Sequence, residues 1–411
     1  MPLTARPWWR QTHVVGLLVA LLMAPCGCRP PDAVPVLADD PLVVPVWWVA
    51  GGDDLTWDQA RDAVWWALSN LGATPPEDEG GIRDVDAAED GVRFTLDLSA
   101  AGFPEASLPA VEAALVPVRD AARTEGAVDL GRFLLATLYD PGRYYAITGA
   151  CPTFEAWRGA RQVPEPGLYA VTVSLLVTDE RLVALNPVLV SGASDDPTLD
   201  TLGWVASEGE GSLVDGTFTP REFETVDVMP NGQQRFAVYD GDGVLRAASA
   251  TGPAGQPGKC MWCHELGVQE GTAENPSAEG YYTYDAFVAE VAAAEALLAS
   301  ARSNMPSAIN WEYATHEWAE QLTMAFLEPS PARVAHEWGV PVESVTALGL
   351  PTHIVPEFPD WGPVYDRADV DAIAPDGPPT LATPPSDRDL HPAWPLVGVD
   401  GLDCAADAGG R

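Results

Sequence analysis

The first part of the chain alternates between strand-like and helix-like patterns of apolar residues. The predicted strands are 43–49 and 92–98, and the predicted helices are 107–124 and 129–138. Thr56, followed three residues later by Gln59, is typical of a capping box and predicts a helix that runs through Leu71. These patterns predict an α/β unit over residues 42–150.

The next hundred residues are rich in β-branched and aromatic runs separated by turn residues. The runs are 168–177, 182–190, 202–206, 225–229, 235–239 and 244–248. Residues 240–243, Asp-Gly-Asp-Gly, predict a hairpin turn between two of them. A calcium-binding loop is disfavoured because Thr251 stands where such a loop needs its last Glu. We therefore expect an antiparallel β-rich domain over residues 151–257.

Helical periodicity returns in the last third of the chain. It predicts helices over 285–302 and 311–327, and two short helices within 330–348 that are broken at Gly339 and Pro341. From residue 349 onward Pro dominates, which predicts an irregular, extended tail over 349–411. The expected fold class is therefore α+β, with a helical segment over 258–348 between the β-rich domain and the tail.

Charge excludes one large class of partners. The formal net charge is −38, and a protein that binds nucleic acid needs basic residues to displace the counterions of the phosphates. Residues 335–345 look superficially like a helix-turn-helix. Because the chain is so acidic, we expect these residues to pack within the fold and not to bind DNA. Anionic lipid surfaces are disfavoured for the same reason.

The N-terminus has the plan of an export signal. Arg6 and Arg10 precede an apolar run over 14–23, which is too short to span a bilayer. The segment resembles a bacterial lipoprotein signal, which implies a signal peptide over 1–27, lipidation of Cys28, and a tether over 28–41. We expect an exported protein, held to a membrane only by its N-terminal lipid and facing the periplasm or the cell surface. Plain secretion is the alternative.

Export places the cysteines in an oxidising compartment, where disulfides persist. In the mature chain, Cys28 is expected to carry the lipid, and the close pair Cys260 and Cys263 has another predicted role, given below. Cys151 and Cys404 are then the cysteines that remain for a disulfide. We expect Cys151 and Cys404 to form a disulfide, with two buried thiols as the alternative.

The run Cys260-Met261-Trp262-Cys263-His264 carries the candidate chemistry. In a Cys-x-x-Cys-His run, two thiols can reach the two vinyl groups of one porphyrin while the next side chain comes up under the iron. A thioredoxin-like redox pair is disfavoured because no βαβ pattern surrounds the run. Half of a zinc site is disfavoured because no second Cys pair has zinc spacing. The run therefore predicts one haem c.

Around this run the chain resembles the c-type cytochromes. The resemblance implies thioether links from Cys260 and Cys263 and iron ligation by His264. Met305 lies in Asn-Met-Pro, which is similar to the loop that supplies the sixth ligand in many single-haem members, and Lys259 could meet a haem propionate. The other sixth-ligand candidates are Met229, Met324, His316 and His336, and the sixth position could also be open.

A β-rich segment before the motif departs from the all-helical cytochrome c fold, and is somewhat similar to cytochrome P460 and β-type cytochrome c′. Electron transfer by a closed His/Met haem is the first hypothesis, with a redox partner protein that presents a basic face. A haem enzyme with open iron is the second hypothesis. An anchored binding module in which haem is structural or absent is the third.

Overall fold

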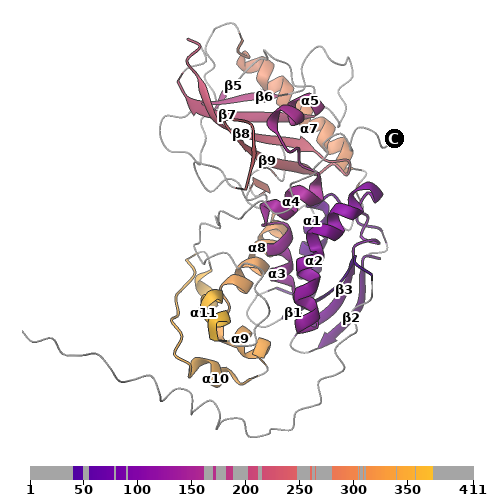
Figure 1. Cartoon of the computed structure of the whole chain (residues 1–411), viewed down its shortest axis with the longest axis vertical. Helices are drawn as coiled ribbons and strands as arrows, with labels where there is room; N and C mark the ends of the chain where they lie inside the picture. The colour runs from indigo at the N-terminus through magenta and orange to yellow at the C-terminus, as the bar shows by residue number, and fades with distance from the viewer. Residues whose placement is uncertain are drawn as a thin grey trace, which may run out of the picture. The chain divides into compact units, whose positions relative to one another are not determined.

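The computed structural model has a mixed α+β fold (Figure 1). It describes residues 40–49, 55–77, 80–88, 91–161, 170–172, 182–187, 202–211, 215–247, 260–261, 264, 280–303, 305, 309, 312–338, 340–356 and 358–373. By internal contacts the chain divides between residues 36 and 37, and all described residues belong to the second unit. No helix among them is both long and apolar enough to cross a bilayer.

A four-stranded sheet is built from the first part of the chain, in the order β2-β3-β1-β4. Its strands are β1 (Val43–Val49), β2 (Ile82–Ala88), β3 (Gly91–Asp97) and β4 (Val128–Asp129). β3 pairs antiparallel with β1 and β2, whereas β4 pairs parallel with β1. Val44, Val46 and Trp48 of β1 are buried, as the alternating pattern requires. The two strands predicted from the sequence here are confirmed, and β2 and β4 were not predicted.

Helices accompany this sheet: α1 (Trp57–Asn70), the short 3₁₀ helix η3 (Glu105–Ser107), α2 (Leu108–Glu125), α3 (Leu130–Thr137) and α4 (Pro141–Thr148). The predicted capping box of α1 is confirmed, because the Thr56 hydroxyl accepts from the backbone N–H of Gln59 while the Gln59 side chain accepts from that of Thr56. Trp65 and Trp66 of α1 are fully buried. The helix is therefore a central element of the core.

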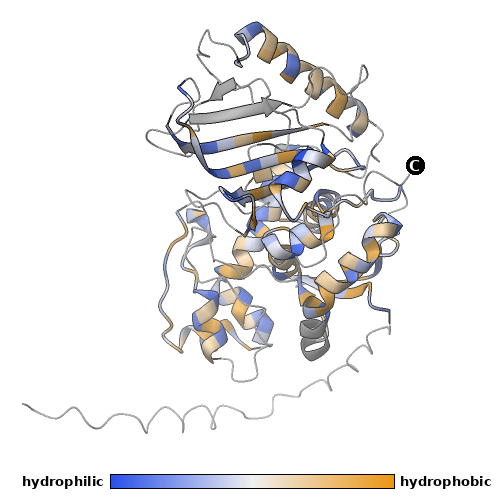
Figure 2. Ribbon diagram, turned by 45° about the horizontal axis from the view of Figure 1, so that its top comes forward, coloured by the Kyte–Doolittle hydropathy of each residue, from blue (hydrophilic) through white to orange (hydrophobic). Residues whose placement is uncertain are grey.

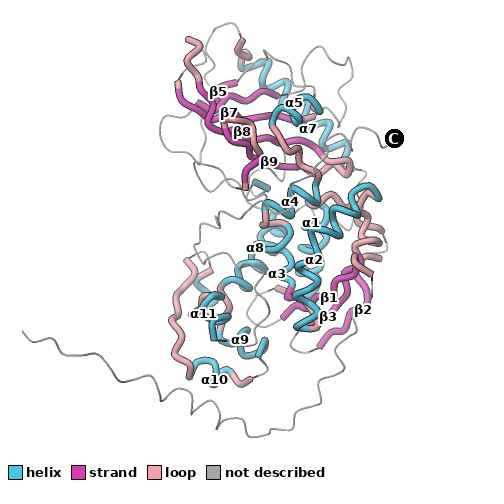
Figure 3. The backbone as a smooth tube through the Cα atoms, viewed as in Figure 1, coloured by secondary structure: helices cyan, strands magenta, loops and turns pink. Residues whose placement is uncertain are grey.

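The second sheet has six strands in the order β10-β9-β8-β7-β6-β5 (Figure 3). They are β5 (Ala170–Thr172), β6 (Leu182–Pro187), β7 (Gly203–Glu210), β8 (Thr219–Val228), β9 (Gln234–Asp240) and β10 (Leu245–Arg246). Every neighbouring pair is antiparallel, and polar and apolar residues alternate along the strands (Figure 2). The hairpin turn predicted at 240–243 is confirmed, with the Gly243 N–H donating to the Asp240 carbonyl.

Helix α5 (Phe154–Ala160) covers one face of this sheet. The ring of Phe154 stacks on that of Phe223 in β8, with centroids 4.1 Å apart. Trp157 donates from Nε1 to a carboxylate oxygen of Asp227 at 2.6 Å. Asp227 also accepts from the guanidinium of Arg235, so that the helix, β8 and β9 share one buried charged cluster.

The C-terminal helices are α7 (Tyr284–Arg302), α8 (Tyr313–Leu327), α9 (Pro331–Trp338), α10 (Val342–Thr346) and α11 (Arg367–Ile373), with a short 3₁₀ helix η5 (Pro359–Trp361) before the last. α8 packs against α1 and α3 so closely that a Cβ on Gly131 would lie 2.0 Å from the Leu322 carbonyl oxygen. The helices predicted over 285–302 and 311–327, and the two short helices on either side of Gly339 and Pro341, are confirmed.

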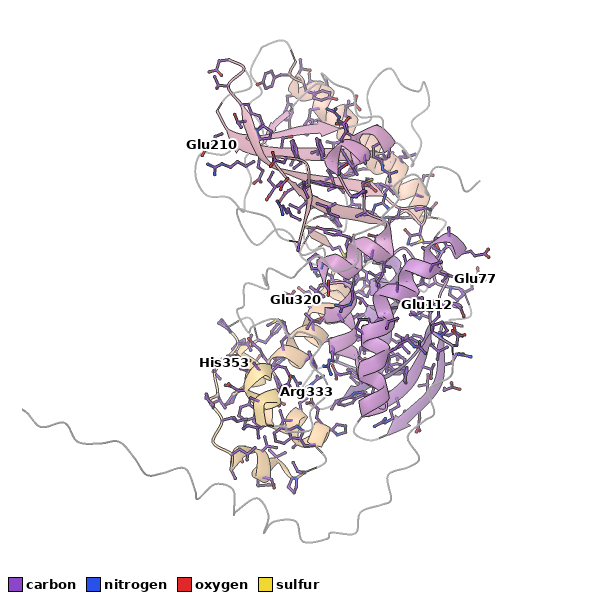
Figure 4. All side chains as sticks on the ribbon, viewed as in Figure 1. Glu77, Glu112, Glu210, Glu320, Arg333 and His353 are labelled. Atoms are coloured by element: carbon purple, nitrogen blue, oxygen red, sulfur yellow. The ribbon has the colours of Figure 1, made fainter. Side chains whose placement is uncertain are left out.

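The extended tail predicted from residue 349 is interrupted by α11 in its described part. Arg367 is 4% exposed and donates to the carboxylate of Glu337 at 2.6 and 2.8 Å. Its guanidinium also lies over the ring of Phe326, 4.4 Å from the centroid. Arg333, labelled in Figure 4, connects the same cluster to Asp129. Long-range charge pairing of this kind has no signal in a local sequence pattern.

Candidate functional site

The candidate motif has helical backbone where the structure describes it, at Cys260, Met261 and His264. Met261 is 1% exposed, and Cys260, which is not part of a disulfide, packs half-buried against the main apolar core. Positions four apart lie on the same face of a helix, which favours Cys260 and His264 facing the same side. Cys263 and Lys259 lie outside the described residues, so their roles stay predictions.

His264 stands against the second sheet. Its ring centroid lies 6.0 Å from that of Phe236 in β9. Burial lowers the pKa of the imidazole, so that the ring is neutral at pH 7. Its Nδ1 is buried without a hydrogen-bond partner in the described part of the chain. A neutral imidazole is the form that binds a metal ion.

Two tyrosines of α4 join this helix to β9 and β10. The Tyr144 hydroxyl accepts from the backbone N–H of Phe236 at 3.3 Å, and the Tyr145 hydroxyl donates to the carbonyl of Arg246 at 3.0 Å. Burial raises the pKa of both phenols, and a negative charge on Cys260 adds to this rise. These relations place the Cys260 side chain beside α4. The tyrosines remain neutral at physiological pH and serve as hydrogen-bonding groups.

Asp140 and Gly149 fix the ends of α4. Asp140 caps the first turn by accepting from the backbone N–H of Arg143 at 3.1 Å. Gly149 ends the helix with φ of 69°, a left-handed conformation that favours glycine. The carbonyl of Gly149 also accepts from Arg235 of β9 at 3.1 Å. The tyrosine-bearing helix is therefore anchored at both ends.

The sheet face under His264 can be followed from the strand register, because directly paired residues of antiparallel strands point to the same face. Phe236 pairs with Val226 of β8, which pairs with Trp204 of β7. All three are at least nine-tenths buried. His264 therefore packs against an apolar row that crosses three strands.

A carboxyl group lies in the next row of the same face. Glu224 pairs with Val238 of β9. Burial, together with the carboxylates of Glu208 and Glu222 in the following row, raises the pKa of Glu224 to about 8. The Glu224 carboxyl therefore holds a proton at neutral pH and can donate or accept one.

Cys151 is disulfide-bonded. It follows the C-terminal end of α4, and its carbonyl accepts from the Tyr239 hydroxyl at 3.0 Å. The other half of this disulfide lies outside the described residues, as do Cys404 and Cys28. The pairing of Cys151 with Cys404 and the lipidation of Cys28 therefore stay predictions.

The sixth-ligand candidates lie on different elements. Met305 follows the end of α7, half-buried, with its N–H donating to the Arg302 carbonyl at 3.0 Å. His316 packs edge-on against Trp66, with ring centroids 4.9 Å apart, and His336 stacks on Trp47.

Met229 lies with its Sδ against Gly72, and Met324 of α8 packs against the main core. The choice of Met305 stays a prediction.

The residues at this site fit a covalently bound haem. The observation that carries this fit is the half-buried, neutral His264 with a buried, orphaned Nδ1, next to Phe236 of the apolar row. A Cys on the same helical turn keeps its thiol. Among the described residues, no group of three or more His, Cys, Asp or Glu side chains could hold a metal ion by itself.

Comparisons with protein-family models, with curated proteins and with solved structures find no match to this chain.

Sequence reasoning missed the residues that surround the motif. Phe236 was expected only as a member of the predicted strand over 235–239, and Glu224 and Tyr144 fell outside every predicted element. The Asp140-Pro141 pair and Gly149 are a helix start and stop signal that could have found α4.

Proposed function

We propose that this protein is an exported, lipid-anchored, c-type cytochrome-like protein that carries one haem and transfers single electrons. The observation that supports it best is the Cys-x-x-Cys-His run whose His264 is neutral and lies half-buried against Phe236. Cys260 and Cys263 would hold the haem through thioethers, and His264 would bind its iron.

Bound at this site, the haem supplies one-electron chemistry. The chain contributes an apolar floor, formed by Met261 and by the row that includes Phe236, which keeps water away and limits reorganisation between redox states. We assign the sixth position to Met305, whose thioether would raise the potential, and we assign Lys259 to a propionate.

The layout that accompanies this function has four parts. They are an α/β unit over 42–150, a β-rich domain over 151–257, a haem-bearing segment over 258–348 and a Pro-rich tail over 349–411. The signal peptide over 1–27 would be removed, and Cys28 would carry the lipid at the end of the tether over 28–41. The body would face the periplasm or the cell surface.

The partner is a redox protein with a basic face. The net charge of −38 favours such a partner, because opposite charges speed encounter. The reduction rate by this partner should therefore fall as ionic strength rises.

An optical spectrum of the mature protein, expressed together with a haem c maturation system, tests this proposal. We expect the reduced spectrum of a six-coordinate haem c and, in the oxidised form, a sulfur charge-transfer band. A protein without a Soret band would contradict the proposal. A matched Cys260→Ala/Cys263→Ala variant, which offers no attachment thiols, gives the baseline.

A second candidate function is catalysis at an open iron, and one observation favours it. Glu224 carries a proton at neutral pH on the sheet face against which His264 packs, and general acid–base groups of this kind accompany many reactions. In this case the oxidised protein would be high-spin and would bind nitric oxide or carbon monoxide, and Glu224→Gln would slow turnover without changing the haem content.

A further inference from the structure

Two adjacent glutamines at the start of β9 are equally buried but differ in their partners. Gln233 is 1% exposed and Gln234 is 2% exposed. The Gln233 side chain donates from Nε2 to the Ser69 hydroxyl of α1 at 2.8 Å. Both Oε1 and Nε2 of Gln234 are buried without a hydrogen-bond partner in the part of the chain that the structure describes. The hydrogen bond to Ser69 accounts for the burial of the Gln233 amide. No such bond accounts for the burial of the Gln234 amide.

Such an amide is costly to bury alone. A buried polar group without a partner destabilises a fold by roughly 1–3 kcal/mol, and an apolar residue of similar size at position 234 would avoid this cost. Buried polar groups in native proteins almost always have a partner, either protein, water or ligand. The partner of Gln234 therefore lies outside the described residues, and a bound group is one of the partners that can supply it.

The position of Gln234 points to the haem site. Residues two apart on a strand share one face of the sheet, so Gln234 lies next to Phe236 along the face against which His264 packs. Along a strand, two residues span roughly 7 Å, so that the Gln234 side chain begins about this distance from Phe236, the ring beside His264. The turn before Gln234 also contacts the end of α7, since a Cβ on Gly232 would lie 3.1 Å from that of Ala301.

We propose that the Gln234 carboxamide binds a propionate of the haem attached to Cys260 and Cys263, with its Nε2 donating to the propionate oxygen. This inference rests on the proposed function. With His264 and Met305 on the iron, the propionates are the only polar groups that the haem still offers. A carboxamide suits such a group because it can donate to a carboxylate and can also accept from its protonated form.

The test compares the two glutamines in protein with and without haem. Gln234→Leu and Gln233→Leu are each made in the full mature chain and in a Cys260→Ala/Cys263→Ala background, and thermal unfolding and the midpoint potential are measured. We expect Gln234→Leu to lower the Tm of the haem protein, yet to leave unchanged or raise the Tm of the background without haem. It should also lower the midpoint potential, because a propionate without its donor favours the ferric state.

Gln233→Leu is the matched control, and it should lower both Tm values equally because its partner Ser69 belongs to the chain. Equal losses for Gln234→Leu with and without haem would overturn the inference, since a buried water or another segment of the chain would then be the partner. A change in iron coordination would overturn it as well, because the amide would then act at the sixth position. If Gln234→Leu does not fold, Gln234→Met keeps the length of the side chain and carries the same expectations.

Absence of haem from the unsubstituted protein would refute the proposed function itself. The haem content of that protein is therefore measured before any variant is compared.

Discussion

Asp227 is the acceptor that holds α5 on the second sheet, and removing its charge is a severe perturbation. The residue is 2% exposed. One of its oxygens lies 2.8 Å from Nη2 of Arg235 and 3.2 Å from Nη2 of Arg161, and the other accepts from Trp157. Asp227→Asn keeps the shape of the side chain but removes the negative charge that faces two buried guanidinium groups.

The magnitude follows from burial. A guanidinium cannot lose its proton within a protein, so both charges persist in the variant. Breaking a buried ion pair from one side costs about 3–5 kcal/mol. The carbonyls of Thr148 and Gly149 also accept from Arg235 and offset part of this cost, so we expect a loss near the lower end. Such a loss is a large part of the roughly 5–15 kcal/mol that stabilises a typical domain.

The assay is urea unfolding followed by tryptophan fluorescence, with Glu155→Gln as the matched control. Glu155 pairs with Arg158 on the same helix at 2.8 Å, but its side chain is 78% exposed. Exposed pairs contribute only about 0.2–1 kcal/mol. If Asp227→Asn reduces the free energy of unfolding no more than Glu155→Gln does, burial does not decide the strength of these ion pairs and the reasoning is wrong.

Further expectations concern the sites that sequence and structure single out. Because the folded pKa of Glu224 is raised to about 8, the folded chain holds more protons than the unfolded chain between the ordinary glutamate pKa and 8. The free energy of unfolding should therefore fall as pH rises through this range. Glu224→Gln should remove that fall. Met305→Ala should abolish the sulfur charge-transfer band, and an unchanged spectrum would exclude this residue as a ligand. Cys28→Ser should move the protein from the membrane to the soluble fraction, and unchanged fractionation would count against the anchor. Peptide mapping without reductant should recover Cys151 joined to Cys404, and any other partner would refute that pairing.

The local part of the fold could be predicted from the sequence because its signals are local. The capping box at Thr56 and the hairpin turn at 240–243 involve residues within four positions of one another, and both appear where expected. The breaks at Gly339 and Pro341 likewise follow from backbone chemistry. These features depend on no distant partner.

The surroundings of the candidate site could not be predicted because they depend on contacts between distant segments. Tyr144 reaches Phe236 from nearly a hundred positions away in the chain, and the buried Asp227 cluster joins α5 to two strands. Gln233 and Gln234 are the same residue type and are equally buried, and only their hydrogen-bond partners distinguish them. Helix α11 likewise depends on the ion pair between Arg367 and Glu337.

Mass spectrometry of the peptide that contains residues 260–264 tests the central claim most directly. The protein is matured with the haem c attachment system, digested without reductant and compared with the Cys260→Ala/Cys263→Ala variant. The account predicts a peptide that carries the added mass of one haem on its two cysteines. A peptide with unmodified thiols, or with Cys263 in a disulfide to Cys151, would contradict it.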